Sequence, residues 1–285
     1  MTVSTADTVP AALHYFSPPA DGSKPYIHIN ADASTGQRQR NWTTVAHDTE
    51  IENIRGKEHT VSLDTTGFQF FKGAVPHTTF ENDEVIEKEY YPQSIDLVKQ
   101  ITGASQIVVF DHTIRRHRPG EVEDTPQKRQ PVPQVHIDQT KDSSIARVHR
   151  HLPAEDVPAL LSKRFQIINL WRPIHHVALD YPLALCDYRT VDRAHDLVAT
   201  TLRYPVRDGE TFNGETFSVK YNPANRWKYV RGMEPDEFVL IKCFDSQDDG
   251  KTAIFTPHTA FEDSTTPKDA PLRESIELRL LVFYD

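Results

Sequence analysis

The segment Val135-His136-Ile137-Asp138-Gln139-Thr140 places a histidine and an aspartate on either side of one apolar residue. Alternate side chains of a β-strand point to the same face, so His136 and Asp138 share one face while Val135 and Ile137 occupy the other. With a second histidine, such a pair forms the two-histidine, one-carboxylate set that binds Fe(II) and leaves coordination positions open. The segment therefore predicts half of an iron site on a strand.

The other half of this site is expected in a distant part of the chain. His258 lies in Phe255-Thr256-Pro257-His258-Thr259-Ala260-Phe261, a strand-like segment near the C-terminus, and we expect it to be the third ligand. His175, His176 and His195 are the alternatives. A hydrogen-bonded surface pair is the alternative explanation for His136 and Asp138.

A candidate carboxylate anchor follows His258. In the extended sequence Arg273-Glu274-Ser275, Arg273 and Ser275 share one side. The planar guanidinium of arginine binds a carboxylate through two hydrogen bonds, so we expect this pair to hold the distal end of a dicarboxylic co-substrate that chelates the iron. Arg279 is the rival anchor. The alternative for Arg273 is a solvated loop arginine.

Two segments combine side chains that suit a substrate pocket. Asn169 and Trp171 face one way along a predicted strand and Arg172 faces the other, while Trp227 lies in Arg226-Trp227-Lys228-Tyr229. We expect substrate contacts from Asn169, Trp171, Arg172 and Trp227. Ordinary core packing at strand ends is the alternative for both segments.

Strand patterns dominate the chain, since β-branched and aromatic residues gather between turn-forming residues. They occur at 61–71 with a break at Gly67, and at 106–111, 165–171, 216–219, 227–230, 237–244, 253–255 and 275–284. Helices are predicted at 82–101 and 154–164, an irregular N-terminal arm over residues 1 to about 45, and a mobile loop at 115–133. With no repeat or linker, residues 1–285 predict one domain, mainly β, a jelly roll or barrel with flanking helices.

Composition narrows the partners. The chain has 285 residues, of which 38% are hydrophobic and 26% charged, as in ordinary globular proteins. A net charge of −9 argues against nucleic acid and against an anionic membrane surface, so a small-molecule partner is expected. An exposed apolar strand would support a homodimer.

Cysteine content and missing motifs limit the compartment and the chemistry. Two cysteines, Cys186 and Cys243, and the lack of a signal-like or membrane-spanning apolar run predict a reducing, cytoplasmic location. No glycine-rich phosphate loop, serine-centred elbow or CxxC pair occurs. Nucleotide enzymes, serine hydrolases and zinc fingers are therefore not favoured.

Several blocks in order resemble the fungal asaB-type hydroxylase/desaturase family, which includes gibberellin desaturases and the cephamycin-pathway component CmcJ. The blocks are Ile51–Gly56, Leu63–Phe68, Val109–Thr113, Val135–Thr140, Asn169–Pro173, Phe244–Ser246 and Arg273–Glu277. The resemblance implies a cupin-like double-stranded β-helix that uses Fe(II), 2-oxoglutarate and O2. It implies His136, Asp138 and His258 as the catalytic metal ligands and Arg273 as the co-substrate anchor. The two histidines are 122 residues apart, which implies inserted segments.

The function implied by this resemblance is hydroxylation, desaturation or cyclisation of a small-molecule intermediate of fungal secondary metabolism. Which of these outcomes occurs depends on how the substrate is placed in the pocket. Two other functions stay open at this point. One is a non-heme iron oxidase that does not use 2-oxoglutarate, and the other is a non-catalytic β-barrel binding protein.

Overall fold

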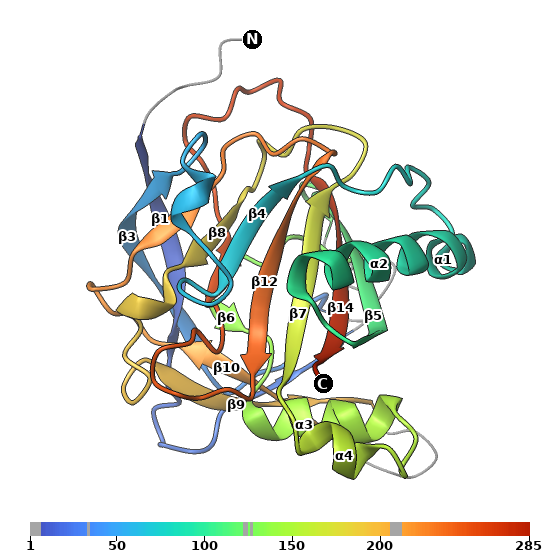
Figure 1. Cartoon of the computed structure of the whole chain (residues 1–285). Helices are drawn as coiled ribbons and strands as arrows, with labels where there is room; N and C mark the ends of the chain where they lie inside the picture. The colour runs from blue at the N-terminus through green and yellow to red at the C-terminus, as the bar shows by residue number, and fades with distance from the viewer. Residues whose placement is uncertain (1–6, 33–34, 122–124, 126–127, 206–212) are drawn as a thin grey trace.

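Two β-sheets form most of the computed structural model, which describes residues 7–285 except 33–34, 122–124, 126–127 and 206–212 (Figure 1). The first sheet has nine strands in the order β1 (Thr8–Ser17), β3 (Thr43–Asn53), β11 (Trp227–Tyr229), β8 (Leu183–Cys186), β13 (His258–Ala260), β6 (His136–Ile137), β10 (Asn213–Val219), β9 (Leu197–Arg203) and β2 (Tyr26–His28). The second has five, in the order β4 (Phe68–Lys72), β12 (Glu237–Asp245), β7 (Phe165–Pro173), β14 (Glu274–Phe283) and β5 (Gln106–Arg116).

The path of the chain between these sheets defines the architecture. From β5 to β8, and again from β11 to β14, successive strands alternate between the five-stranded and the nine-stranded sheet. This alternation produces a jelly roll, the double-stranded β-helix, and confirms the predicted mainly β fold with flanking helices. The β9–β10 hairpin and two helices lie between His136 and His258 in the chain, which accounts for the long interval between them.

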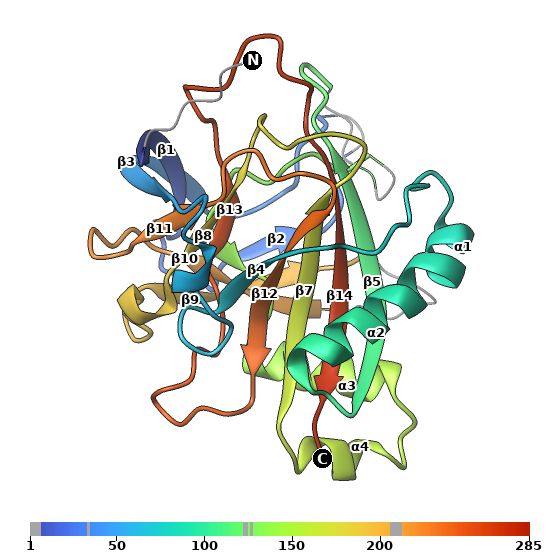
Figure 2. The ribbon, with the colours of Figure 1, turned by 45° about the horizontal axis from the view of Figure 1, so that its top comes forward.

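One helical segment crosses the outer face of the five-stranded sheet (Figure 2). It consists of α1 (Asp83–Val85), a π-helical turn (Ile86–Tyr90) and α2 (Tyr91–Thr102), and it ends at Gly103 with φ 71°. The prediction of a helix at 82–101 is confirmed. The π turn widens the helix and shifts its face, which explains why the apolar residues follow a 3.6-residue period only loosely. Ile86, Tyr90 and Val98 are buried against this sheet.

A second pair of helices lies at one end of the barrel, α3 (Lys141–His151) and α4 (Val157–Leu161) (Figure 1). The predicted helix at 154–164 is shorter in the structure, and α3 was not predicted. Its start carries a recognisable signal, because the Thr140 hydroxyl accepts from the Ser143 amide and the Ser143 hydroxyl accepts from the Thr140 amide. This capping box sets the direction of the chain directly after the His-x-Asp pair.

Three predictions about loops and strands are wrong. Residues 8–17 and 26–28, expected in an irregular arm, form β1 and β2, and β1 pairs with β3 from Thr8↔Glu52 to Ser17↔Thr43. Alternate residues of β1 are buried, so its strand period was visible despite the flanking prolines. Residues 61–63 lead into turns, and 253–255 form no strand. Part of the predicted loop at 115–133 lies outside the described residues, and its first two residues belong to β5.

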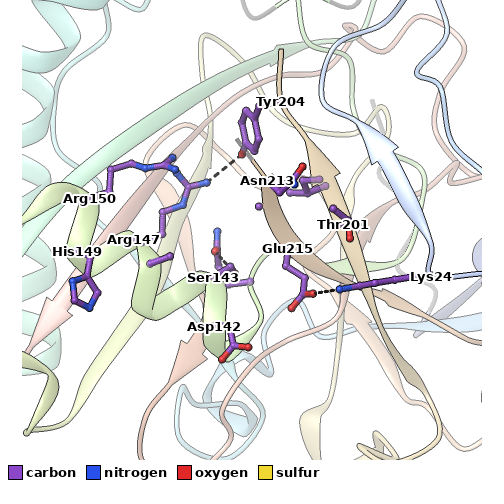
Figure 3. A pocket seen from close by; sticks show the side chains of 14 residues that line it. Lys24, Asp142, Ser143, Arg147, His149, Arg150, Thr201, Tyr204, Asn213 and Glu215 are labelled. Atoms are coloured by element: carbon purple, nitrogen blue, oxygen red, sulfur yellow. Dashed lines mark hydrogen bonds and ion pairs between the residues drawn. The ribbon is translucent and has the colours of Figure 1, made fainter. Parts of the chain in front are cut away.

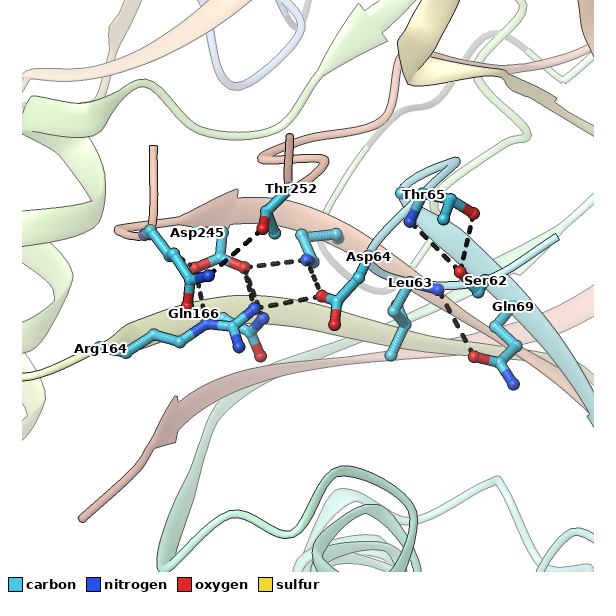
Figure 4. Close-up of polar contacts among 12 residues, drawn as sticks. Ser62, Leu63, Asp64, Thr65, Gln69, Arg164, Gln166, Asp245 and Thr252 are labelled. Atoms are coloured by element: carbon cyan, nitrogen blue, oxygen red, sulfur yellow. Dashed lines mark hydrogen bonds and ion pairs between the residues drawn. The ribbon is translucent and has the colours of Figure 1, made fainter. Parts of the chain in front are cut away.

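A polar network around the buried Lys242 and Asp245 ties the turn at 62–67 to the five-stranded sheet (Figure 4). The fully buried Lys242 ammonium donates to Asp64 Oδ1 at 2.9 Å and to Asp245 Oδ2 at 2.8 Å. The Arg164 guanidinium binds both Asp245 oxygens, at 3.1 and 2.6 Å. Burial alone would raise the pKa of Asp245, but these two cations hold it below its ordinary value. Asp64 and Asp245, both in the blocks that carry the family resemblance, therefore meet in a structural network.

The remaining regular elements are 3-10 turns at Glu58–Thr60 and Tyr188–Thr190. None of the helices in the described part of the chain has the length and apolar character needed to cross a membrane.

Candidate metal centre

His136, Asp138 and His258 lie together inside the barrel. Strands β6 and β13 are neighbours, and His258 pairs with His136 in register. The Nε2 atoms of His136 and His258 lie 3.4 and 3.8 Å from Asp138 Oδ1, and one ligand atom from each residue lies within 4.8 Å of the others. The predicted pair thus meets the distant histidine at one point, although only His136 lies on the strand and Asp138 lies in the bend directly after β6. The other histidines weighed, His175, His176 and His195, are not part of this group.

Backbone carbonyl groups orient both imidazoles. His136 Nδ1 lies 2.7 Å from the carbonyl oxygen of Gln134, and His258 Nδ1 lies 3.0 Å from that of Thr256. A ring that donates its Nδ1 hydrogen to a carbonyl keeps Nε2 as the free donor atom for a metal. Both Nε2 atoms face Asp138, so the two rings have the orientation in which Nε2 can bind a metal beside this carboxylate.

Asp138 is held from the side opposite the histidines. Asn169 Nδ2 donates to Asp138 Oδ2 at 2.7 Å, and Arg279 Nε lies 3.5 Å from the same oxygen. Burial would raise the pKa of Asp138, but the hydrogen bond with His136 and the charge of Arg279 lower it well below its ordinary value. The carboxylate is therefore ionised, with Oδ1 left toward the histidines. The sequence predicts a substrate contact for Asn169, and in the structure its amide donates to the Asp138 carboxylate.

A close backbone approach supports the loop before His258. Gly67 has φ +90°, and a Cβ there would lie 2.3 Å from Thr256 Oγ1 and 2.7 Å from the Phe255 carbonyl oxygen. The Thr256 hydroxyl donates to the Gly67 carbonyl at 2.6 Å, while the Thr256 carbonyl accepts from His258. Only glycine fits this position, so the turn at 62–67 sets the place of His258 through Thr256.

Arg273 and Ser275 are buried at the start of β14. Arg273 Nη1 donates to the Tyr181 carbonyl at 2.5 Å, and its guanidinium lies 5.5 Å from the Trp171 ring centre. Arg273 Nε and Ser275 Oγ are buried without a hydrogen-bond partner. Burial, followed by the charge of Arg115, lowers the pKa of Arg273 to about 9. A buried cation and hydroxyl with unused donors form a site in need of an anion.

Arg279 lies closer to the metal ligands but is already engaged. Its Nη1 donates to Asp111 and Thr113 at 3.0 and 2.9 Å, and its Nη2 donates to Glu277 at 2.7 Å. Burial would lower the pKa of Arg279, but the charges of Glu277 and Asp138 raise it. A second carboxylate would have to displace those partners.

A cavity of about 860 Å³ opens beside His136 and Asp138. Arg115, Arg147 and Arg279 are among its lining residues, and the first two were not singled out from the sequence. The sequence gives little indication of their place in the cavity, since neither arginine belongs to a motif. A second cavity, of about 760 Å³, adjoins the first between α3 and the β9–β10 strands, and the two cavities share Gln139, Arg147, Arg150, Leu202 and Tyr204 (Figure 3).

The other predicted substrate residues lie apart from this cavity. Trp171 is buried and lies against Arg273. Arg172 points to the opposite face, where Nη1 donates to the Val75 carbonyl at 2.9 Å. Trp227 lies in the core under β1 and donates from Nε1 to Tyr15 at 2.9 Å. None of the three is among the described residues that line the cavity.

Comparison with known proteins places this geometry in a family. The model of the oxidoreductase/YMDC permease-like domain matches residues 13–283. The hydroxylase/desaturase efuI of Hormonema carpetanum is 34% identical over 98% of this chain and 96% of its own length. The Fe(II)/2-oxoglutarate-dependent dioxygenase nvfI of Aspergillus novofumigatus is 31% identical over 94% of both chains.

A solved structure resembles the whole fold. The iron and alpha-ketoglutarate-dependent endoperoxidase NvfI superposes with a TM-score of 0.81 and 28% identity, and covers 98% of each chain. The likeness in sequence and the likeness in structure therefore extend over the same, nearly complete length.

Proposed function

This chain belongs to the family of fungal hydroxylase/desaturases and Fe(II)/2-oxoglutarate-dependent dioxygenases, and on that premise we propose that His136, Asp138 and His258 hold its ferrous ion and that Arg273 and Ser275 hold its 2-oxoglutarate. As a member it is an oxidoreductase that uses Fe(II), 2-oxoglutarate and O2 on a small molecule. It is therefore not a mere β-barrel binding protein.

The donor set fits the ion. Two neutral imidazoles and one carboxylate suit Fe(II) and leave other positions open for a co-substrate. The observation that carries the assignment is the convergence of three ligand atoms within 4.8 Å, on rings whose Nδ1 atoms are already bound by backbone carbonyls. Asn169 and Arg279 hold Asp138 from behind and serve as positioning residues.

The buried, unpaired polar atoms fit the co-substrate. Among the described residues, Arg273 makes no ion pair, and both its Nε and the Ser275 hydroxyl lack a partner. A carboxylate would accept from both and compensate the buried charge. Because Arg279 is committed to Asp111 and Glu277, we favour Arg273 as the anchor.

The bound iron, with 2-oxoglutarate and O2, supplies an oxidant for a substrate C–H bond while 2-oxoglutarate is converted to succinate and CO2. The barrel residues orient these groups and exclude water from them. Hydroxylation, desaturation and cyclisation are the outcomes open to such a site, and the position of the substrate selects between them.

The test is anaerobic addition of Fe(II), with and without 2-oxoglutarate, to the protein and to its His136→Ala and His258→Ala variants. We expect a weak visible absorption band of the Fe(II)–2-oxoglutarate chelate in the unchanged protein and its loss in both variants. The exposed His195→Ala variant is the control and should keep the band. A band of unchanged strength in His258→Ala would refute the ligand assignment. Succinate formation coupled to turnover separates this function from an oxidase that does not use 2-oxoglutarate.

We also propose that the enzyme is cytoplasmic, acts without nucleic acid or a membrane, and forms a homodimer. The support is the net charge of −9 and the edge strand β1, which forms a ladder with β3 and on its other side only the isolated bridge His14↔Gln134 among the described residues. Sedimentation velocity over a range of concentrations tests the dimer.

A further inference from the structure

The cavity beside the metal ligands is cationic in a chain whose net charge is −9. Its described lining contains two acidic residues, Asp111 and Asp138, against six arginines. The arginines are Arg38, Arg115, Arg129, Arg147, Arg150 and Arg279. A concave wall with one sign of charge attracts ligands of the other sign.

Both acidic residues of the lining have partners of their own. Asp111 accepts from Arg279 at 3.0 Å, and Asp138 belongs to the proposed metal centre. Ferrous ion and the doubly charged co-substrate carry opposite charges, so together they leave the charge of the wall unchanged.

Arg147 of α3 is the clearest case. Its Nη2 donates to the Tyr204 hydroxyl at 3.3 Å (Figure 3). Its guanidinium lies 5.4 Å from the Phe110 ring centre. Among the described residues no carboxylate lies within ion-pair distance of it. Because Tyr204 accepts from Arg147, the hydroxyl proton of Tyr204 is left for a further acceptor. Arg150, one turn later on α3, adds a second positive charge to the same wall.

Another part of the wall is apolar. Ile27, Ile29, Trp42, Val132 and Leu202 contribute to the same cavity. A ligand that fills it gains most when an apolar body covers these side chains and an anionic group meets the arginines.

We propose that the substrate of this enzyme is an amphipathic organic anion, and that Arg147 and Tyr204 bind its carboxylate or similar acidic group. The proposal rests on the proposed function, since it takes this cavity as the substrate site. It places α3, the helix that directly follows the His-x-Asp pair, as the element that selects the substrate by charge.

The test compares two probes of equal shape, 2-naphthoate and the neutral 2-naphthamide. Calorimetry measures both on protein loaded anaerobically with Fe(II) and saturating 2-oxoglutarate, so that the co-substrate anchor is occupied. We expect 2-naphthoate to bind about tenfold or more tightly than the amide, the usual value of one hydrogen bond to a charged group. The preference should weaken with added salt, because part of it is Coulombic.

Variants test which residues cause the preference for 2-naphthoate over 2-naphthamide. Arg147→Gln should abolish it, Arg147→Lys should keep part of it, and Tyr204→Phe should reduce it without touching a charge. Arg193→Gln is the control, because Arg193 pairs with Asp248 on the surface. Equal affinities in the unchanged protein, no binding of 2-naphthoate at millimolar concentration, or an unaltered preference in both Arg147→Gln and Tyr204→Phe would overturn the proposal. The chelate band recorded in the same samples reports on the proposed function separately, since Arg147→Gln should leave it intact.

Discussion

Arg273→Met is the substitution that best separates a binding role from a structural one. Arg273 is 2% exposed, and its hydrogen-bond partner in the structure is the neutral Tyr181 carbonyl. Keeping an under-compensated cation buried costs stability, so an apolar replacement of similar length should leave the iron-free protein unchanged or stabilise it by about 1 kcal/mol or more. At most other buried polar residues, an apolar replacement would instead lower the stability of the protein.

The same substitution should weaken the binding of 2-oxoglutarate. A hydrogen bond to a charged group contributes about 1.5–3 kcal/mol, so loss of two of them raises the Kd about 100-fold or more. At 100 times its Kd, the ligand stabilises the unchanged protein by about 2.7 kcal/mol, and at that concentration it should stabilise the variant very little. With an unfolding entropy of about 0.6 kcal/mol/K for a chain of 285 residues, the expected difference in Tm is about 4–5 °C.

Anaerobic thermal unfolding with Fe(II), with and without 2-oxoglutarate, measures both effects together with titration of the chelate band. Arg231→Met is the matched control, because Arg231 is equally buried but pairs with Asp263 at 2.5 Å. That variant should lose about 3–5 kcal/mol, since it leaves a buried carboxylate unpaired. An Arg273→Met protein that is strongly destabilised, yet binds 2-oxoglutarate with unchanged Kd, would refute the anchor assignment.

Three further predictions concern the supports of the metal centre and of the fold. Gly67→Ala should weaken Fe(II) binding, measured by anaerobic titration, more than Gly73→Ala does, because both have positive φ and only Gly67 faces a close contact. Asn169→Ala should raise the Kd for Fe(II) about 10- to 100-fold with little change in fold, because removal of a residue that is hydrogen-bonded to a metal ligand weakens metal binding by that factor. An unchanged Kd would contradict the proposed positioning of Asp138 by Asn169. The pKa of the Asp245 carboxyl is lower in the folded than in the unfolded state, so its contribution to stability is present above the unfolded pKa and is lost as pH falls through and below about 4. Asp245→Asn should therefore reduce the fall in the free energy of unfolding at acid pH, measured by urea unfolding. An unchanged dependence on pH would contradict the argument.

The parts of the site that could be predicted from the sequence are those in which geometry is local. The two-residue repeat of a strand was enough to predict that His136 and Asp138 come together, although β6 ends at Ile137 and Asp138 lies in the bend that follows. The same repeat predicted Arg273 and Ser275 as a pair, and both are buried at the start of β14. The capping box at Thr140 would have located α3 by an equally local rule. The strand period of β1 is also present in the sequence, but the prolines after it are typical of an irregular segment.

Other features depend on which strands become neighbours. Asn169 reaches Asp138 only because β7 and β6 lie in facing sheets, and nothing in the sequence Asn169–Pro173 distinguishes a substrate contact from a contact with a metal ligand. Arg147 faces the cavity because α3 packs against β10. The π turn at Ile86–Tyr90 has no sequence signal that a 3.6-residue period could detect.

The two candidate histidine ligands lie on very short strands, and Asp138 lies in the bend directly after β6. β6 has two residues and β13 has three, so their ladders contribute few hydrogen bonds to fixing the ligands. The ligands are instead fixed from outside these strands, by Gln134 and Thr256 carbonyls for the rings and by Asn169 for the carboxylate. Short strands leave the open end of the barrel free for ligands, while these contacts keep the donor atoms in place. Substitutions in the supports should therefore change iron affinity before they change the stability of the fold.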